Sequence, residues 1–118
     1  MENGSSFKFG DFVLDPHEQT LVQNDANVAI TPKVFQLLRF LVENPGRIVE
    51  KDELMAAVWA ESFVEESNLT YTIRQLRKIL GDDFSQPKFI ETVPRRGYRF
   101  IGDVSVSSKS EPAEIVPA

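Results

Sequence analysis

The chain has 118 residues, 42% of them hydrophobic, with 13 basic and 18 acidic side chains and a formal net charge of −5. This length supports one buried core, so we expect a single domain. Cysteine is absent and His17 is the only histidine, which excludes a disulfide framework, a thiolate zinc site and a cysteine nucleophile. The apolar runs are too short to cross a bilayer and the N-terminus carries no secretion signal, so we expect a cytoplasmic location.

Composition divides the chain into three parts. Residues 1–6 are polar and are expected to be disordered. Residues 7–102 carry the periodic patterns of a folded domain. Residues 103–118 are rich in serine and proline, so we expect a flexible linker or tail there.

Short strand patterns fill the first thirty residues of the sequence. Four apolar segments are bounded by turn-forming residues: 7–9, 12–14, 20–22 and 28–30. The Asn-Asp-Ala-Asn sequence over residues 24–27 tolerates turn dihedrals and predicts a hairpin between the last two segments. Together the four segments predict a small four-stranded antiparallel sheet.

Two helices are expected next. Thr31 is a suitable N-cap and Pro32 suits the first helical position. Apolar residues then recur at helical spacing until an Asn-Pro-Gly sequence ends the first helix. The second helix is expected from Lys51 to Trp59, with acidic residues in its first turn.

An acidic connection over residues 60–66 leads to a third helix over residues 67–80. Ser67 or Asn68 can cap this helix, and Gly81 can end it. Its apolar residues lie within about 60° of one another on a helical wheel: Leu69, Ile73, Leu76 and Leu80. The opposite side and its flank carry Thr70, Tyr71, Arg74, Gln75, Arg77 and Lys78.

A basic hairpin ends the folded region. Residues 89–93 and 98–101 are strand-like and are joined by a Pro-Arg-Arg-Gly turn, in which Gly97 can supply a positive φ. Residues 74–99 hold seven basic and three acidic side chains, whereas the rest of the chain is strongly acidic. A basic sector on an acidic body is typical of a domain that presents one face to a polyanion.

The third helix has side chains that suit the major groove of DNA, into which an α-helix fits. Gln75 can pair with adenine, Arg74 with guanine or a phosphate, and Tyr71 can stack or contact a thymine methyl. Arg77 and Lys78 are better placed for phosphates. The alternative is an ordinary amphipathic helix with a solvated face.

The basic turn follows this helix after about fifteen residues. Arg95 or Arg96 can enter a narrow minor groove, where the negative potential is enhanced, while the helix occupies the adjacent major groove. The alternative is that both arginines only keep a surface turn soluble.

Two motifs resemble a known family. Residues 69–82, LTYTIRQLRKILGD, and residues 90–100, IETVPRRGYRF, resemble the OmpR/PhoB-type winged helix-turn-helix domain, particularly its CadC- and ToxR-like members. The resemblance covers residues 7–102. It implies an α+β fold with an N-terminal four-stranded antiparallel sheet, three helices and a C-terminal β-hairpin wing.

The resemblance also implies roles for individual residues. It places Thr70, Tyr71 and Gln75 at base-reading positions and Arg74 nearer the DNA backbone. Because Arg74 can also bind guanine, we include it among the expected base-reading residues. Positions that contact the DNA backbone would be Lys51, Trp59, Asn68, Thr72, Arg77, Lys78 and Thr92. Because Pro94 stands where many members have an arginine, Arg95 and Arg96 would make the minor-groove contacts. The acidic loop matches a region that often contacts RNA polymerase, through Glu61, Phe63, Glu65 and Glu66.

We therefore expect the effector domain of a bacterial-type transcriptional regulator that binds double-stranded DNA sequence-specifically. Helix 67–80 would occupy the major groove and wing 94–97 the minor groove, without a metal, a cofactor, a small-molecule substrate or catalysis. Family likeness adds RNA polymerase as a partner, tandem dimers on DNA and a natural chain that is anchored in the inner membrane beyond residue 118.

Two alternatives come from other functional classes. The first is a protein-interaction module that contacts RNA polymerase through residues 60–66 without reading DNA. The second is a small hydrolase, for which the sequence offers no nucleophile, base and orienting residue.

Overall fold

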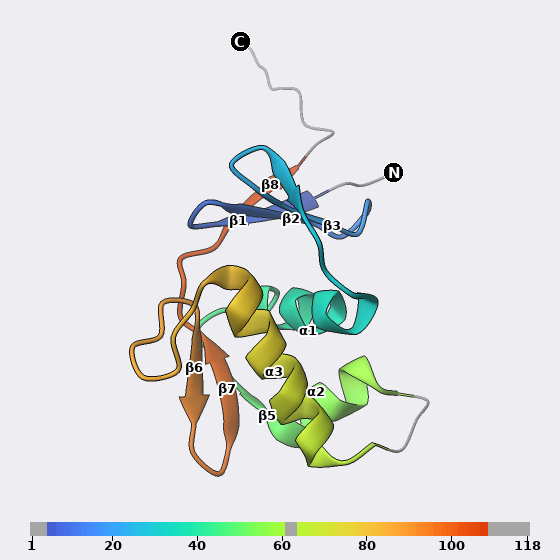
Figure 1. Cartoon of the computed structure of the whole chain (residues 1–118), viewed down its shortest axis with the longest axis vertical. Coiled ribbons are helices and arrows are strands. Elements are labelled where there is room, and N and C mark those ends of the chain that lie inside the picture. Colours follow the sequence, from blue (N-terminus) through green and yellow to red (C-terminus); the bar gives the residue numbers. More distant parts are fainter. Residues whose placement is uncertain (1–4, 61–63, 109–118) are drawn as a thin grey trace.

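The computed structural model describes residues 5–60 and 64–108, which form two antiparallel sheets and three α-helices. The larger sheet has five strands in the order β4-β3-β2-β1-β8. Its strands are β1 (Ser5–Phe9), β2 (Phe12–Asp15), β3 (Thr20–Gln23), β4 (Ala26–Val28) and β8 (Ser105–Ser108). Figure 1 shows this sheet at one end of the molecule, beside α1.

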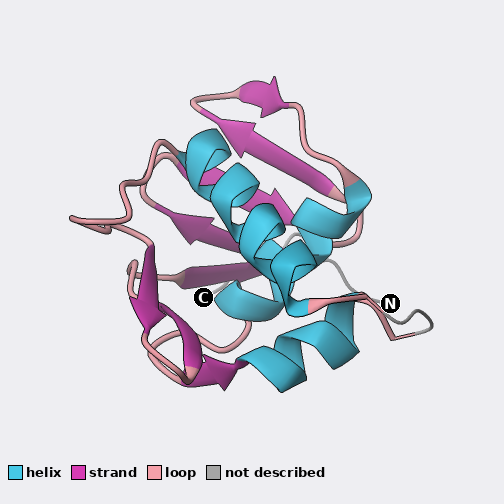
Figure 2. Ribbon diagram, turned by 60° about the horizontal axis from the view of Figure 1, so that its bottom comes forward, coloured by secondary structure: helices cyan, strands magenta, loops and turns pink. Residues whose placement is uncertain are grey.

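The second sheet is three-stranded, in the order β5-β7-β6. It consists of β5 (Ile48–Glu50), β6 (Ile90–Val93) and β7 (Gly97–Phe100). The helices are α1 (Pro32–Val42), α2 (Lys51–Val58) and α3 (Glu66–Leu80). The tip of the β6–β7 hairpin and the N-terminal end of α3 lie at the end of the molecule away from the five-stranded sheet (Figure 1). Figure 2 shows the helices packed together, with the hairpin beside them.

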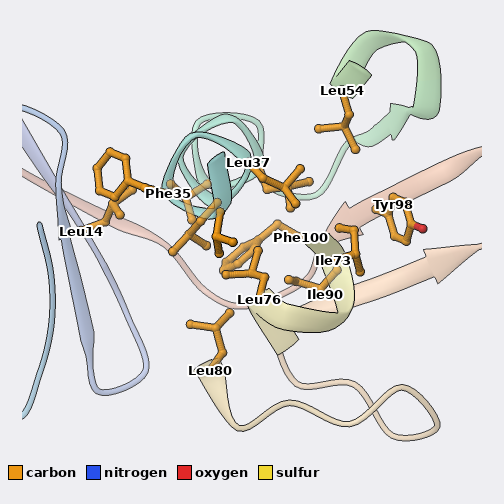
Figure 3. Packing of buried hydrophobic residues seen from close by; sticks show 14 of the residues in the cluster. Leu14, Phe35, Leu37, Leu54, Ile73, Leu76, Leu80, Ile90, Tyr98 and Phe100 are labelled. Carbon is orange, nitrogen blue, oxygen red and sulfur yellow. The ribbon is translucent and has the colours of Figure 1, made fainter. Parts of the chain in front are cut away.

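A continuous apolar core joins the helices to both sheets. Phe100 is fully buried and lies between side chains of α1 and α3, among them Leu37 and Leu76 (Figure 3). The apolar side of the third helix is buried as predicted: Leu69, Ile73, Leu76 and Leu80. Burying each such side chain contributes about 1.5–3 kcal/mol to stability, so this face fixes which side of α3 remains in solvent.

The predicted hairpin within the first thirty residues is confirmed, with a shorter turn. Asn24 and Asp25 have φ values of 51° and 67°, and a two-residue type I′ turn requires positive φ at both central positions. Ala26 therefore already belongs to β4 and pairs with Gln23. Strand β4 ends at Val28, two residues before the predicted end.

The predicted starts of the first two helices are confirmed. Thr31 caps α1, and its Oγ1 accepts a hydrogen bond from the backbone N–H of Val34 at 3.5 Å. Helix α2 starts at Lys51, and Glu50 makes no side-chain capping bond.

The predicted cap of the third helix is wrong. Glu65 is the N-cap residue and α3 starts at Glu66, so Ser67 and Asn68 lie within the first turn. The backbone N–H of Asn68 donates to the Glu65 carbonyl at 2.8 Å, which closes that turn. At the other end, Gly81 ends α3 with a φ of 69°, as predicted.

Two predicted boundaries of the folded domain are also wrong. Ser5 and Ser6 belong to β1 rather than to a disordered N-terminus. Residues 105–108 form β8 rather than a linker, and they pair antiparallel with β1 from Ser5↔Ser108 to Lys8↔Ser105. Without β8, the outer edge of β1 would present unpaired backbone groups, and a returning segment satisfies them. The sheet consequently has five strands rather than four.

Within the described residues, no helix combines the length and the hydropathy needed to span a bilayer.

Candidate nucleic-acid interface

The solvent-facing side of α3 carries polar and aromatic side chains on successive turns. Thr70, Tyr71, Arg74 and Lys78 are exposed, with Tyr71 at 59%, and Gln75 is half-buried beside them. Gln75 Nε2 donates a hydrogen bond to the Tyr71 hydroxyl at 3.2 Å. This bond orients the amide before any ligand arrives and leaves its oxygen and second N–H available to a base edge.

The β6–β7 hairpin places a basic turn beside that helix. The turn comprises Pro94–Arg96 and so ends one residue before the predicted end of the wing, because Gly97 already belongs to β7. Arg95 is exposed and adopts a φ of 67°. Arg96 Nη2 lies 3.5 Å from a carboxylate oxygen of Glu50 at the end of β5.

Gly97 serves a different purpose from the predicted one. The positive φ of the turn belongs to Arg95, whereas Gly97 is needed because a Cβ there would lie 2.0 Å from the Val49 carbonyl oxygen. Strand β5 runs directly against Gly97, which pairs with Glu50. The prediction of a positive φ at Gly97 is therefore wrong, and the three-residue strand β5 that requires glycine there could not be predicted from the sequence.

A pocket of about 350 Å³ separates α3 from the hairpin. Its lining consists of Thr70, Ile73, Arg74, Arg77, Phe84, Thr92 and Tyr98. The pocket thus lies between the basic flank of the helix and the hairpin, which are joined beside it by the hydrogen bonds from Arg77 to Ile90 and Thr92.

Lys51 lies at the junction of β5, α2 and the start of α3. Its Nζ lies 2.6 Å from Glu66 Oε2, and this hydrogen bond raises the pKa of the Lys51 ammonium. Trp59 follows at the end of α2, half-buried and packed against the core. Lys51 therefore lies close to the N-terminal end of α3, where a helix dipole favours an anion.

This arrangement of helix and wing matches known proteins. The family model described as "Transcriptional regulatory protein, C terminal" matches residues 25–100. The chain belongs to this OmpR/PhoB-type family of winged helix-turn-helix domains. Family members are non-enzymatic DNA-binding effector domains of bacterial transcriptional regulators.

Curated relatives of this OmpR/PhoB-type domain are considerably longer proteins. The transcriptional regulator HilA of Salmonella typhi is 37% identical over 110 residues, which cover 93% of this chain and 20% of HilA. The transcriptional activator CadC of Escherichia coli (strain K12) is 33% identical over 110 residues, covering 92% of this chain and 22% of CadC. The chain thus spans about a fifth of the length of these relatives.

Solved structures share the fold over most of the chain. The DNA-binding domain of E. coli CadC has a TM-score of 0.75 at 29% identity, covering 89% of this chain and 98% of that chain. The DNA-binding domain of Klebsiella pneumoniae RstA, in complex with the RstA box, has a TM-score of 0.73 at 28% identity. That match covers 81% of this chain and 96% of the RstA domain.

Two residues that the sequence placed against the DNA backbone are directed into the OmpR/PhoB-type domain itself. Thr72 is buried, and its hydroxyl donates to the Asn68 carbonyl at 2.7 Å. Arg77 is half-buried and donates from Nη2 to the Ile90 carbonyl at 3.0 Å and to Thr92 Oγ1 at 2.7 Å. Burial lowers the pKa of the Arg77 guanidinium, although nearby Asp82 raises it. Both side chains therefore have hydrogen-bond partners within the domain, and their predicted phosphate contacts stay predictions.

The remaining predicted contacts fall into three groups. Asn68 and Lys78 are exposed on α3, while the Thr92 hydroxyl already accepts the hydrogen bond from Arg77. In the acidic segment, Glu65 is exposed, and Glu66 belongs to α3 and pairs with Lys51 rather than lying in a loop. Glu61 and Phe63 lie outside the described residues.

Asp82 has a structural role that the sequence did not reveal. Its Oδ1 accepts the N–H of Lys88 at 2.6 Å, and its Oδ2 accepts those of Phe89 at 3.2 Å and Ile90 at 2.8 Å. The carboxylate thereby fixes the start of β6 against the end of α3. A Gly-Asp-Asp sequence after a helix indicates a loop, but it does not identify partners six to eight residues further along.

Proposed function

We propose that this chain binds double-stranded DNA sequence-specifically, with α3 in the major groove and the turn Pro94–Arg96 in the adjacent minor groove. One observation carries the proposal: the N-terminal end of α3, a helix with an exposed polar face, lies with the basic hairpin tip at the end of the molecule away from the five-stranded sheet (Figure 1). An α-helix and a basic turn in this relation suit adjacent grooves of one duplex. The RstA DNA-binding domain, which shares this fold, is solved in complex with the RstA box, and this supports DNA as the ligand.

The base-reading residues are proposed to be Thr70, Tyr71, Arg74 and Gln75. The pre-oriented Gln75 amide matches the N6 and N7 groups of adenine, since it can accept one hydrogen bond and donate another. Arg74 is free to pair with guanine or a phosphate because it forms no salt bridge within the described residues. Tyr71 is exposed enough to contact a thymine methyl.

Phosphate contacts are proposed for the cations around this face. Lys78 and Arg95 are exposed, and neither makes a salt bridge in the described parts of the chain. Arg96 and Lys51 have carboxylate partners, so a phosphate would have to compete with Glu50 and Glu66 for them. Asn68 and Trp59 complete the proposed set at the ends of α3 and α2.

Further partners follow from the same proposal. A DNA ligand requires the domain to face the cytoplasm, and tandem binding on repeated half-sites stays a prediction, as does a membrane anchor outside the present sequence. RNA polymerase is proposed to contact the acidic segment before α3, in which Glu65 is exposed.

Salt dependence tests the proposed phosphate contacts. If about four phosphates are neutralised, the logarithm of the binding constant should fall against the logarithm of salt concentration with a slope near −4. The Lys78→Ala variant should make the slope shallower by about 1. Lys8→Ala is the matched control, because Lys8 is an exposed lysine of β1 in the distant sheet and should leave the slope unchanged. A wild-type slope shallower than about −2 would refute the proposed interface.

A further inference from the structure

Arg77 joins the recognition helix to the wing. From the last turn of α3 its Nη2 donates to two acceptors on β6, the Ile90 carbonyl at 3.0 Å and the Thr92 hydroxyl at 2.7 Å. Its guanidinium also lies over the Phe84 ring, with 5.4 Å between Cζ and the ring centroid. Hydrogen bonds from a charged donor are stronger than neutral ones, and the cation–π contact with Phe84 adds to them. This single side chain therefore stabilises the packing of α3 against β6.

The contacts that the structure shows for the Arg77 guanidinium lie within the protein. Arg77 Nε is buried and has no hydrogen-bond partner among the described residues. The neighbouring cations Arg74 and Lys78 are exposed on the same helix and make no such bonds within the described residues. Arg77 therefore differs from them in what it contacts, although the sequence presents all three as one basic surface.

We propose that Arg77 is a positioning residue that fixes the wing relative to α3 and thereby sets the preference of the domain for its specific DNA site. This inference rests on the proposed function. Helix α3 and the wing must enter adjacent grooves of one duplex. They bind best when their relative position is fixed in the free protein, because no conformational entropy is then lost in ordering them on binding. Random DNA, held mainly through phosphates, needs this fixed geometry less.

Other roles for Arg77 predict different measurements. A phosphate contact would support all sequences equally and contribute about 1 to the salt slope. A purely stabilising contact would lower the unfolding temperature but leave the ratio of specific to random affinity unchanged below that temperature. Only a positioning role lowers this ratio while keeping the salt slope.

Binding of specific and random duplexes by Thr92→Val and Arg77→Met distinguishes these roles. Thr92→Val keeps the charge and size at the junction and removes one acceptor, so it serves if Arg77→Met does not fold. We expect each folded variant to lose about tenfold in specific affinity, with random affinity and salt slope unchanged. Lys78→Ala is the matched control and should weaken both duplexes alike. Equal losses on both duplexes for Arg77→Met, with a shallower slope, would overturn the proposal.

A measurement without DNA tests the same junction. Residual dipolar couplings of amides in α3 and in β6–β7 should fit one alignment tensor in the wild-type protein and require two in Thr92→Val. A single tensor in the variant, together with an unchanged affinity ratio, would refute the positioning role. If the wild-type protein shows no preference for any duplex, the proposed function fails, and the couplings still decide whether Arg77 fixes the wing.

Discussion

Gln75 is the residue whose substitution best separates base reading from general attraction to DNA. Its amide is held by the Tyr71 hydroxyl at 3.2 Å, on the side of α3 opposite the buried leucines. A bidentate amide–adenine pair discriminates against the wrong base by about 1–3 kcal/mol. The residue carries no charge, so its removal leaves the attraction to phosphates intact.

We expect Gln75→Ala to lose about 1–3 kcal/mol of preference at one base pair, with little change in affinity for random DNA. Competition binding with duplexes substituted at each position measures this. Gln36→Ala is the matched control, because Gln36 is exposed on α1, outside the proposed interface. Equal losses by Gln75→Ala on specific and random duplexes would exclude a base-reading role.

Gly97 allows β5 to pack so closely against the wing that there is no room for even a Cβ atom. We expect Gly97→Ala to lower the free energy of unfolding by at least about 2 kcal/mol, because the added atom would lie 2.0 Å from the Val49 carbonyl oxygen. Gly81→Ala is the comparison variant, since no atom lies within 4 Å of the added Cβ. Its positive φ alone should cost about 1–2 kcal/mol. Urea unfolding measures both, and a smaller loss for Gly97→Ala would contradict the close approach.

At the scale of elements, length and periodicity decided what the sequence could predict. The apolar face of α3 and the Thr31 cap of α1 were evident, because a helix of 15 or 11 residues repeats its pattern several times. Strand β5 has three residues and β8 has four polar or alternating ones, so neither shows a period. Both are strands only because of a partner far away in the chain, β7 for one and β1 for the other.

Strand β8 is expected to be the least stable strand of its sheet. Each of its backbone hydrogen bonds contributes about 1 kcal/mol, and ordering each residue costs about 1–2 kcal/mol, so the pairing nearly balances. Hydrogen exchange should therefore be much faster for β8 amides than for those of β2, and removal of residues 105–118 should leave DNA affinity unchanged. Equal protection of β8 and β2 would show that the C-terminal strand is integral to the core sheet.

At the scale of the whole molecule, charge is segregated rather than balanced. The chain carries a net charge of −5, yet seven basic residues lie between positions 74 and 99, on α3, the loop that follows it and the hairpin. This distribution orients the domain toward a polyanion and keeps the acidic remainder away from it. The sequence alone indicated this segregation. It did not show that Arg77 and Arg99 are held by Thr92 and Glu91, because such pairing depends on the fold.

Selection from a random pool of duplex DNA, with competitor DNA at about 0.1 M salt, tests the central claim most directly. Exposed charges are then screened beyond about 10 Å, so attraction to phosphates alone gives little enrichment. We expect one motif to be enriched, with a position whose preference is lost in Gln75→Ala. Salt-sensitive binding without enrichment of any motif would contradict sequence-specific recognition by this domain. Complete absence of binding would favour the protein-interaction module instead.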